Sequence, residues 1–206
     1  MSSDESNEFR RALEKESCNY GVTMFAETLD RLAKYFELLS SWNSQLHLVA
    51  PTSPREFATR HVLESLLLVD YFPEGAHVAD IGSGGGLPMI PCVIARPDIT
   101  AVLIESSKKK AVFLREALSL SGGSQATVIP ERFEAVATPD VNFVTCRALE
   151  RFEKMLPQMI AWAPPAATLL LFGGPGLEKS IAPLGVNVVA KLIPRSEKRF
   201  LFKVDR

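Results

Sequence analysis

Glycine dominates one short segment of the chain, directly after an apolar run. The segment runs from Val78 to Pro88 and has glycine at positions 82, 84, 85 and 86, before a helix-compatible stretch from Met89 to Ala95. Glycine adopts backbone angles that other residues avoid, and it has no side chain to keep a ligand away. The N-terminus of the following helix presents free N–H groups. A strand, a bare turn and a helix start together predict a cradle for a nucleotide-like cofactor, although a tight structural turn also explains the glycines.

A carboxylate ends the next apolar run. Glu105 follows Ala101–Ile104. In a doubly wound sheet this strand lies beside the first one, so Glu105 is expected near the glycine loop at the carboxyl edge. A carboxylate there can accept hydrogen bonds from both ribose hydroxyls of a nucleoside. NAD and S-adenosylmethionine both contain such a ribose, so Glu105 does not separate them, and a helix-capping role also explains an acid at this position.

Three consecutive lysines, Lys108–Lys110, open the helix after Glu105. Cations are slightly unfavourable at a helix N-terminus, because the helix dipole is positive there. The lysine run is therefore consistent with a polyanionic partner, and equally with an ordinary solvated group of charges.

Polar residues also follow the third and fourth apolar runs. Arg132, Phe133 and Glu134 follow the third run. There the Phe133 ring can lie on an adenine, and Glu134 can accept hydrogen bonds from the adenine amino group. The alternative is a core phenylalanine beside a surface acid. Arg147 follows Val141–Cys146. An arginine at the end of the fourth strand can bind a phosphate, a cofactor carboxylate or the target base, or form a structural salt bridge.

Composition limits the class of protein. The chain has 206 residues, 47% of them hydrophobic, a net charge of −1 and three cysteines. These values predict one structural unit without disulfides or metal, in a reducing compartment, which we take to be the cytoplasm. No apolar run approaches the roughly 20 residues that span a bilayer, so no membrane association is expected. The near-neutral charge excludes a protein that binds nucleic acid over its whole surface, but basic residues gather locally around Lys108–Arg115 and Lys191–Arg206.

The chain divides at about residue 74. Residues 1–74 are expected to form a helical N-terminal extension, because Phe25, Leu29, Leu32, Phe36 and Leu39 recur at helical spacing, and Ser53-Pro54 predicts the start of another helix toward Tyr71. Residues 75–206 alternate short strands with helices, which predicts a parallel α/β sheet. The predicted elements are strands at His77–Ile81, Thr100–Ile104, Ala126–Ile129, Val141–Cys146 and Ala167–Phe172, and helices beginning near Leu87, Lys108, Arg132 and Glu150.

The last two strand-like runs, Val186–Ile193 and Arg199–Val204, are joined by a loop too short for a crossover helix. They predict an antiparallel hairpin. A Rossmann-like sheet of seven strands that ends in such a hairpin resembles the fold of S-adenosylmethionine-dependent methyltransferases, with the helical extension packed on the sheet.

Several segments, in order and spacing, match one methyltransferase family. The chain resembles the GidB-type guanine-N7 methyltransferases of bacterial small-subunit (16S) ribosomal RNA over roughly residues 35–202. The matching segments are Trp42–Leu48, Arg60–Ser65, Asp80–Pro91, Glu105-Ser106, Lys109-Lys110, Phe113-Leu114, Arg132–Glu134 and Cys146–Ala148.

The resemblance implies a role for most of these residues. It implies that S-adenosylmethionine lies against Gly82, Gly84, Gly86 and Leu87, with Glu105 on the ribose and Phe133 and Glu134 on the adenine. It implies that Arg147 reaches the methionine end or the transfer site, as a positioning residue without a general base. Arg60, His61, Lys109, Lys110 and Arg132 are then candidates to contact RNA, presented within the 30S particle to a monomeric enzyme.

Four positions depart from the family pattern. His47 stands where asparagine is usual, Glu64 replaces an aspartate, Met89 replaces a glycine at the helix start, and Phe172 replaces a lysine. Two other functions stay open. The glycines and Glu105 also permit an NAD-dependent oxidoreductase, and Met89 and Phe172 leave open a non-catalytic RNA-binding or ribosome-assembly factor with a degenerate cofactor pocket.

Overall fold

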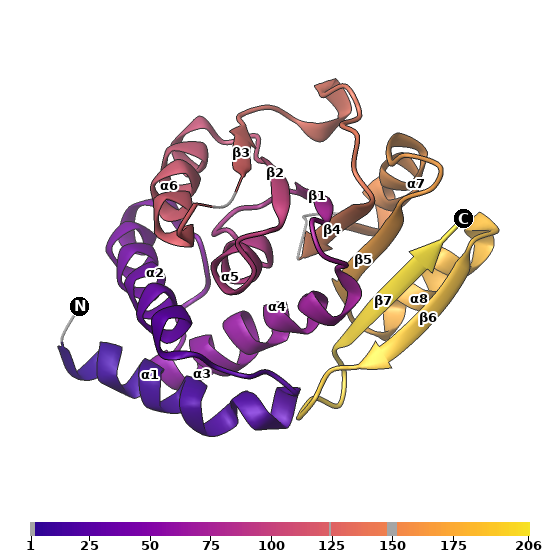
Figure 1. Cartoon of the computed structure of the whole chain (residues 1–206). Helices are drawn as coiled ribbons and strands as arrows, with labels where there is room; N and C mark the ends of the chain where they lie inside the picture. Colours follow the sequence, from indigo (N-terminus) through magenta and orange to yellow (C-terminus); the bar gives the residue numbers. More distant parts are fainter. Residues whose placement is uncertain (1–2, 124, 148–151) are drawn as a thin grey trace.

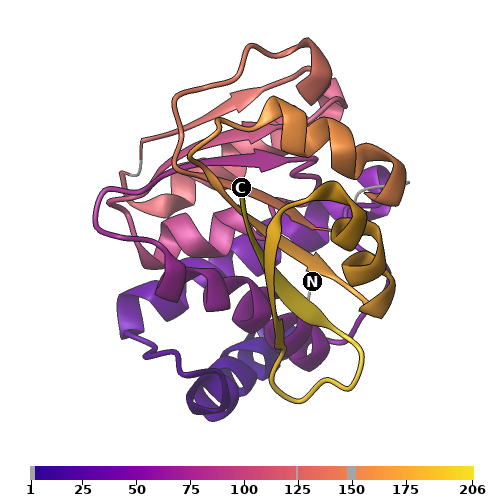
Figure 2. The same ribbon diagram turned by 90° about the vertical axis from the view of Figure 1, so that its right-hand side faces the viewer.

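The centre of the protein is a mixed sheet of seven strands in the order β3-β2-β1-β4-β5-β7-β6 (Figures 1 and 2). The structure is a computed structural model that describes residues 3–123, 125–147 and 152–206. The strands are β1 His77–Ile81, β2 Thr100–Ile104, β3 Ala126–Ile129, β4 Phe143–Arg147, β5 Thr168–Gly173, β6 Asn187–Leu192 and β7 Phe200–Asp205. The expected fold class, a Rossmann-like sheet with a terminal hairpin and a helical extension, is confirmed.

The first five strands are parallel, and β7 and β6 are antiparallel to their neighbours. In the register, Ile81 at the end of β1 pairs with Ile104 of β2 on one side and with Cys146 of β4 on the other. The residues that follow these strand ends therefore meet at one edge of the sheet. Because β7 runs the other way, its first residue, Phe200, pairs with Gly173 at the end of β5. The hairpin loop thus also lies at the carboxyl edge.

Helices cover both faces of the sheet (Figures 1 and 2). The helices are α1 Ser3–Glu16, α2 Ala26–Leu46, α3 Pro54–Glu56, α4 Glu64–Leu66, α5 Met89–Ala95, α6 Lys108–Leu118, α7 Phe152–Trp162 and α8 Pro175–Ile181. Alternate strand residues point to opposite faces. Accordingly Leu170 and Phe172 belong to the hydrophobic cluster that also contains residues of α2, α5 and α6, whereas Leu169 and Leu171 belong to the cluster that contains residues of α7 and α8. No helix in the described part of the chain is long and apolar enough to cross a membrane.

The N-terminal helices share a hydrophobic core with the sheet. Phe9 of α1, Leu32 of α2 and Phe57 are fully buried in the same cluster as Leu103 of β2. The apolar stripe on α2 agrees with the predicted helix, with one exception. Phe25 precedes the helix and is 68% exposed, so the prediction that it belongs to the buried stripe is wrong.

The predicted helix from Pro54 toward Tyr71 is a continuous helical run with irregular hydrogen bonding. As expected, the Ser53 hydroxyl caps its first turn by accepting from the N–H of Glu56 at 3.1 Å. Residues Phe57–Leu63 are π-helical, and the run ends as a 3₁₀ turn at Leu67–Tyr71. We refer to residues 54–71 as the connecting helix.

Three helix predictions need comment. The helix expected near Arg132 is wrong, since only a short 3₁₀ turn, Phe133–Ala135, forms there before Pro139. The helix expected at Leu87 begins two residues later, at Met89. The start expected near Glu150 lies outside the described residues, and α8 was not anticipated, although Gly174-Pro175 is a suitable helix start.

The end of α2 carries local backbone strain. His47 has φ +48° and ψ +53°, the left-handed conformation that glycine and asparagine adopt most readily. The resemblance described above implies asparagine at this position, and asparagine fits the same backbone with less strain. The His47 side chain is exposed, so it contributes little packing in return.

Replacing His47 with glycine should therefore raise the free energy of unfolding by about 0.5–1 kcal/mol. The matched control is Gln45→Gly, an exposed position inside α2, where the same change should lower stability by about 1 kcal/mol. Chemical denaturation of both variants checks the prediction, and destabilisation of equal size at the two positions contradicts it.

Candidate functional site

A cavity of about 470 Å³ opens at the carboxyl edge of the sheet. Its walls are the glycine loop, the segment after β2, the end of β4, the connecting helix, and residues Leu48–Ala50. Of the residues predicted from the sequence, the cavity is lined by Gly82, Gly84, Leu87, Glu105, Lys110, His61 and Arg147. Its size lies within the roughly 300–1,000 Å³ range of pockets for small molecules.

The glycine loop needs glycine for its backbone shape. Gly82, Gly84 and Gly86 have φ values of +70°, +52° and +83°. A side chain at Gly86 would place its Cβ 2.3 Å from Cγ1 of Ile90, so this glycine allows the loop to pack against α5. Gly86 thus contributes to the shape of the glycine loop through its contact with α5, and it is not among the residues that line the cavity.

Glu105 holds the glycine loop in place from the neighbouring strand. Its Oε2 accepts from the N–H of Gly84 at 2.8 Å, and its Oε1 accepts from the N–H of Ser107 at 2.7 Å. The side chain is 7% exposed and lines the cavity. The predicted position beside the glycine loop is therefore confirmed, and each oxygen keeps a further lone pair for a ligand.

Tyr35 of α2 holds the loop from the opposite side. Its hydroxyl donates to the carbonyl of Gly85 at 2.6 Å, and the side chain is fully buried. Burial raises the pKa of Tyr35, which keeps the phenol protonated as a donor. Nothing in the local sequence pattern around Tyr35 indicates which backbone oxygen its side chain reaches.

Asp80 lies below the glycine loop, at the penultimate position of β1, and is completely buried. Its Oδ1 accepts from the Thr145 hydroxyl at 2.7 Å, whereas its Oδ2 is buried without a hydrogen-bond partner among the described residues. Burial raises the pKa of Asp80 to about 7; the Ser83 and Thr145 hydroxyls oppose this rise, and the nearby Glu105 carboxylate adds to it. An unpaired buried carboxylate oxygen makes Asp80 a candidate ligand contact, although the residue is not among those that line the cavity.

Arg147, the last residue of β4, lies at the junction of the cavity and the connecting helix. Its side chain is 13% exposed and forms an ion pair with Glu64 at 3.0 Å. Its guanidinium stacks over the ring of Phe172, 5.1 Å from the centroid. Phe172 therefore supports Arg147 directly, whereas a lysine at that position would repel it.

His61 lines the cavity as a neutral side chain. Burial, with the Arg147 and Arg60 charges, lowers the pKa of His61 to about 4. Its ring lies 5.2 Å from that of Phe57, and its Nδ1 is buried without a partner among the described residues. Arg60 points outward on the same helix, half-exposed and paired with Glu56.

The remaining predicted residues lie outside this cavity. Lys109 and Arg132 are exposed, and Phe133 is 5% exposed with its ring packed edge-on against Trp162 at 5.9 Å. Phe133 thus has the packing role that the sequence also allowed, beside an exposed Glu134. The loop that carries them follows Ile129, whose carbonyl accepts from the N–H of Glu105 at 3.1 Å, so it is next to the Glu105 end of the cavity.

Met89, where the family pattern has glycine, does not obstruct the site. Its side chain is fully buried in the core at the start of α5 and is not among the residues that line the cavity.

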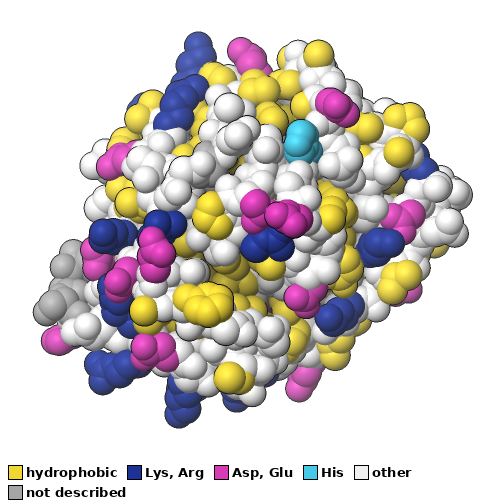
Figure 3. Space-filling model, in the orientation of Figure 1, with side chains coloured by type: hydrophobic (Ala, Val, Ile, Leu, Met, Phe, Trp, Pro, Cys, Tyr) yellow, Lys and Arg dark blue, Asp and Glu magenta, His cyan; other side chains and the backbone are white. Residues whose placement is uncertain are grey.

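Basic and acidic side chains are interspersed on the face of the molecule shown in Figure 3, in keeping with the net charge of −1.

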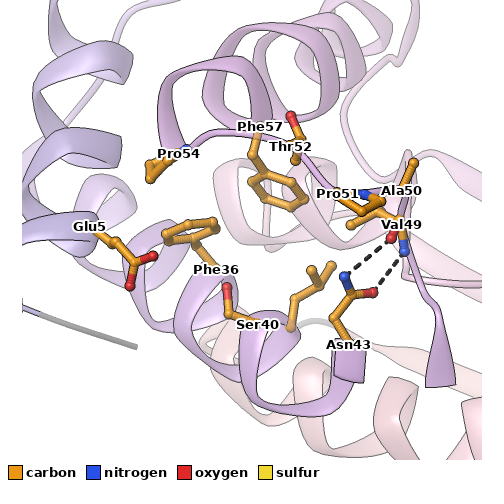
Figure 4. Close-up of a pocket in the computed structure, with 11 residues that line it drawn as sticks. Glu5, Phe36, Ser40, Asn43, Val49, Ala50, Pro51, Thr52, Pro54 and Phe57 are labelled. Carbon is orange, nitrogen blue, oxygen red and sulfur yellow. Dashed lines mark hydrogen bonds between the residues drawn. The ribbon is translucent and has the colours of Figure 1, made fainter. Parts of the chain in front are cut away.

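A second cavity of about 430 Å³ lies on the other side of Val49 and Ala50, between α1, α2 and the connecting helix (Figure 4). The side chain of Asn43 fixes the dividing segment, since its amide donates to the Val49 carbonyl at 3.1 Å and accepts from the Val49 N–H at 3.0 Å. Phe36 and Phe57 line this cavity, but they are 6% and 0% exposed and offer no open aromatic surface.

The fold is that of the Rossmann-like methyltransferases of known structure. The chain matches the L11 methylase structure from Lactobacillus delbrueckii subsp. bulgaricus with a TM-score of 0.59 at 15% identity, covering 71% of this chain and 78% of that one. It also matches the magnesium protoporphyrin IX methyltransferase from Synechocystis PCC 6803, solved with bound SAM, with a TM-score of 0.55 at 16% identity over 91% and 88% of the two chains. At these identities the likeness concerns the fold.

Sequence relatives define the family. The model described as GidB, rRNA small subunit methyltransferase G, matches residues 28–191, and the chain belongs to this family. Proteins named ribosomal RNA small subunit methyltransferase G include one from Sorangium cellulosum, 37% identical over 79% of this chain and 71% of its own length. Another, from Halorhodospira halophila, is 32% identical over 89% of this chain and 87% of its own length. The resemblance inferred from the motifs is thereby confirmed.

The raised pKa of Asp80 predicts a distinct dependence of stability on pH. An unfolded aspartate titrates near pH 4 and the buried one near pH 7, so its stabilising contribution is complete below about pH 4 and is lost as the pH rises through 7. Asp80→Asn is uncharged at every pH. The parent should lose on the order of 2 kcal/mol of unfolding free energy between pH 5 and pH 8 through this group, and the variant should not. The unfolding free energy of the variant minus that of the parent should therefore rise by this amount over the same range. Urea denaturation at both pH values measures the difference, and a difference independent of pH contradicts the assignment.

Proposed function

We propose that this protein transfers a methyl group from S-adenosylmethionine to N7 of a guanine in small-subunit ribosomal RNA. The observation that carries the proposal is the cavity at the end of β1, β2 and β4, with a glycine loop braced by Glu105, in a chain of the GidB family. The reaction belongs in the cytoplasm, where ribosomal subunits are found.

The residues of the cavity fit the proposed cofactor. Gly82 and Gly84 offer a surface without side chains, and Glu105 keeps lone pairs for the two ribose hydroxyls. The unpaired Oδ2 of Asp80 suits a positively charged group such as the ammonium of the methionine part, which would favour the charged form of the carboxylate, although Asp80 is fully buried and does not itself line the cavity. S-adenosylmethionine, when bound, supplies a methyl group activated by an adjacent sulfonium charge.

The adenine end of the proposed site is the loop after β3. Glu134 is exposed and can accept a hydrogen bond from the adenine amino group, and Leu87 offers an apolar contact within the cavity. Phe133 supports this loop through its packing on Trp162. Because the Phe133 ring faces Trp162, we expect the contact of Phe133 with the adenine to come from the backbone of the short turn that begins at this residue.

The proposed reaction requires positioning more than proton transfer. Guanine N7 has a free lone pair at neutral pH, so no residue must remove a proton before it attacks the methyl carbon. His61, with a pKa of about 4, is a poor base at pH 7 and is suited to binding as a neutral ring. Holding the two reactants in line accounts for the catalysis that we ascribe to this site.

Arg147 cannot lie against N7 itself, because the base gains positive charge during transfer. We assign Arg147 to the phosphate, to guanine O6 or to the carboxylate of the cofactor, each of which a guanidinium binds favourably. Its place at the end of β4 on the wall of the cavity supports that role.

The proposed RNA face surrounds the opening of the cavity. Lys110 and His61 both line the cavity, their sequence neighbours Lys109 and Arg60 are exposed, and Arg132 is exposed on the loop after β3. N7 lies in the major groove, which is deep and narrow in A-form RNA. We therefore expect the substrate to be an accessible nucleotide presented by the 30S particle to a monomer of this protein.

The function is tested with ribosomal subunits from a strain that lacks this activity. Incubation with S-adenosylmethionine carrying a tritiated methyl group should label the small subunit, and nuclease mapping should place the label on N7 of one guanine. Calorimetry with S-adenosylmethionine and with NAD compares the two cofactors. Binding of NAD alone supports an oxidoreductase, and binding of RNA without methyl transfer supports an assembly factor; either result overturns the proposal.

Replacement of Arg147 with alanine should lower methyl transfer by roughly 100-fold, because misplacement of one reactant by about 1 Å has an effect of that size. Circular dichroism serves as the check that the fold persists. The matched control is Arg115→Ala on α6, an exposed arginine away from the cavity, which should retain methyl transfer. Equal incorporation by Arg147→Ala and the parent rejects the assignment of this residue.

A further inference from the structure

Arg147 is held by several groups of the connecting helix. Its Nη2 donates to the carbonyl of Arg60 at 2.5 Å and to Oε2 of Glu64 at 3.0 Å. Its Nη1 lies 3.5 Å from the carbonyl of His61 and from the Ser65 hydroxyl. These acceptors lie on one side of the guanidinium, whose plane rests on Phe172. The position of Arg147 at the cavity is thus set by the connecting helix.

Glu64 is the charged member of this set. It is 1% exposed, and its second oxygen, Oε1, accepts from Nε of Arg199 at 2.9 Å and pairs with Nη2 of Arg199 at 2.7 Å. One buried carboxylate therefore joins the end of β4 to the loop that precedes β7. A buried charge of this kind is tolerated only with its partners, so its neutralisation disturbs both arginines.

The π-helical stretch makes room for this contact. In a regular α-helix the N–H of Glu64 would donate to the carbonyl of Arg60, four residues earlier. Here it donates to the carbonyls of Thr59 and His61 instead. The Arg60 carbonyl is thereby free to accept a hydrogen bond from Nη2 of Arg147, at 2.5 Å. The irregular hydrogen bonding of Phe57–Leu63 and the position of Arg147 are two aspects of one arrangement.

A second buried carboxylate provides an internal comparison. Glu16, at the end of α1, is 3% exposed and pairs with Arg55 at 3.0 Å and with Arg195. Arg195 belongs to the same hairpin loop as Arg199. Glu16 and Glu64 therefore have the same chemistry and a similar structural role, but only Glu64 contacts Arg147, and Glu16 is not among the residues that line the cavity.

We propose that Glu64, supported by Arg199, is a positioning residue that holds the Arg147 guanidinium in its working orientation at the cavity. This inference rests on the proposed function, in which Arg147 contacts the cofactor or the target nucleotide. Arg147 has five N–H donors; Nη1 and Nη2 face acceptors on the connecting helix, and the Nε–H, for which no acceptor is found among the described residues, remains for the ligand. Glu64 acts only through Arg147 and does not itself line the cavity.

Two substitutions of Glu64 distinguish a positioning role from a merely structural one, because one removes the charge and the other shortens the side chain. Glu64→Gln keeps the size and removes the charge, whereas Glu64→Asp keeps the charge and shortens the side chain. If Glu64 positions Arg147 by its charge, kcat/KM for methyl transfer should fall by about 10-fold or more in Glu64→Gln and by about 3-fold or less in Glu64→Asp. If it only fills space, the order is reversed and the inference is overturned.

Glu16→Gln is the matched control for loss of a buried charge. Both Gln variants should lower the melting temperature by similar amounts, but Glu16→Gln should keep kcat/KM within about 2-fold of the parent, since it leaves Arg147 in place. A loss of activity in Glu16→Gln as large as that in Glu64→Gln would show that activity follows stability and would overturn the inference.

Arg199→Ala and Arg195→Ala extend the test to the hairpin loop, in case Glu64→Gln does not fold. Arg199→Ala should lower kcat/KM by about 3-fold or more, and Arg195→Ala by less than about 2-fold. Equal activities for this pair also contradict the inference. Failure of the proposed function is distinguished from failure of this inference by the parent protein. If the proposed function is wrong, the parent itself transfers no methyl group under the same conditions.

Discussion

The backbone of the glycine loop is held by two side chains, and the remainder of the site depends on this restraint. Glu105 accepts from the N–H of Gly84, and Tyr35 donates to the carbonyl of Gly85. A run of glycines is otherwise the most mobile backbone that a sequence can encode. Because each hydrogen bond comes from a different layer, the loop keeps one shape only when α2 is packed on the sheet. The helical extension is therefore part of the site.

The same principle applies to the opposite wall of the cavity. Arg147 comes from the sheet, but the groups that hold it come from the connecting helix and from the loop before β7. The two buried glutamates, Glu16 and Glu64, each join an N-terminal helix to this hairpin loop. Buried ion pairs add little net stability, yet they select one arrangement because any other leaves a charge unpaired. In this protein they fix where three separate segments meet.

Much of this architecture could be predicted from the sequence. The bounds of β1, β2 and β3 agree with the prediction, because each is a short apolar run between turn-forming or polar residues, and the short loop after Ile193 required an antiparallel hairpin. Placement of Glu105 followed from the order of parallel strands. The contacts of Tyr35 and Arg199 could not be predicted, since they join residues separated by 50 and 135 positions, and no local pattern encodes such pairs. Phe133 shows the same limit, because its spacing fits a ligand contact and a core contact equally well.

The contact between Glu64 and Arg199 has a consequence for the order of assembly. Closing so long a segment of chain is entropically slow, and the antiparallel insertion of β7 beside β5 must precede it. The strands β1 and β2, with the glycine loop between them, come from a much shorter stretch of chain. From these lengths of chain we expect the strands around the glycine loop to pair before the segments that orient Arg147 come together. The two walls of one cavity thus differ in how far apart their parts lie along the chain.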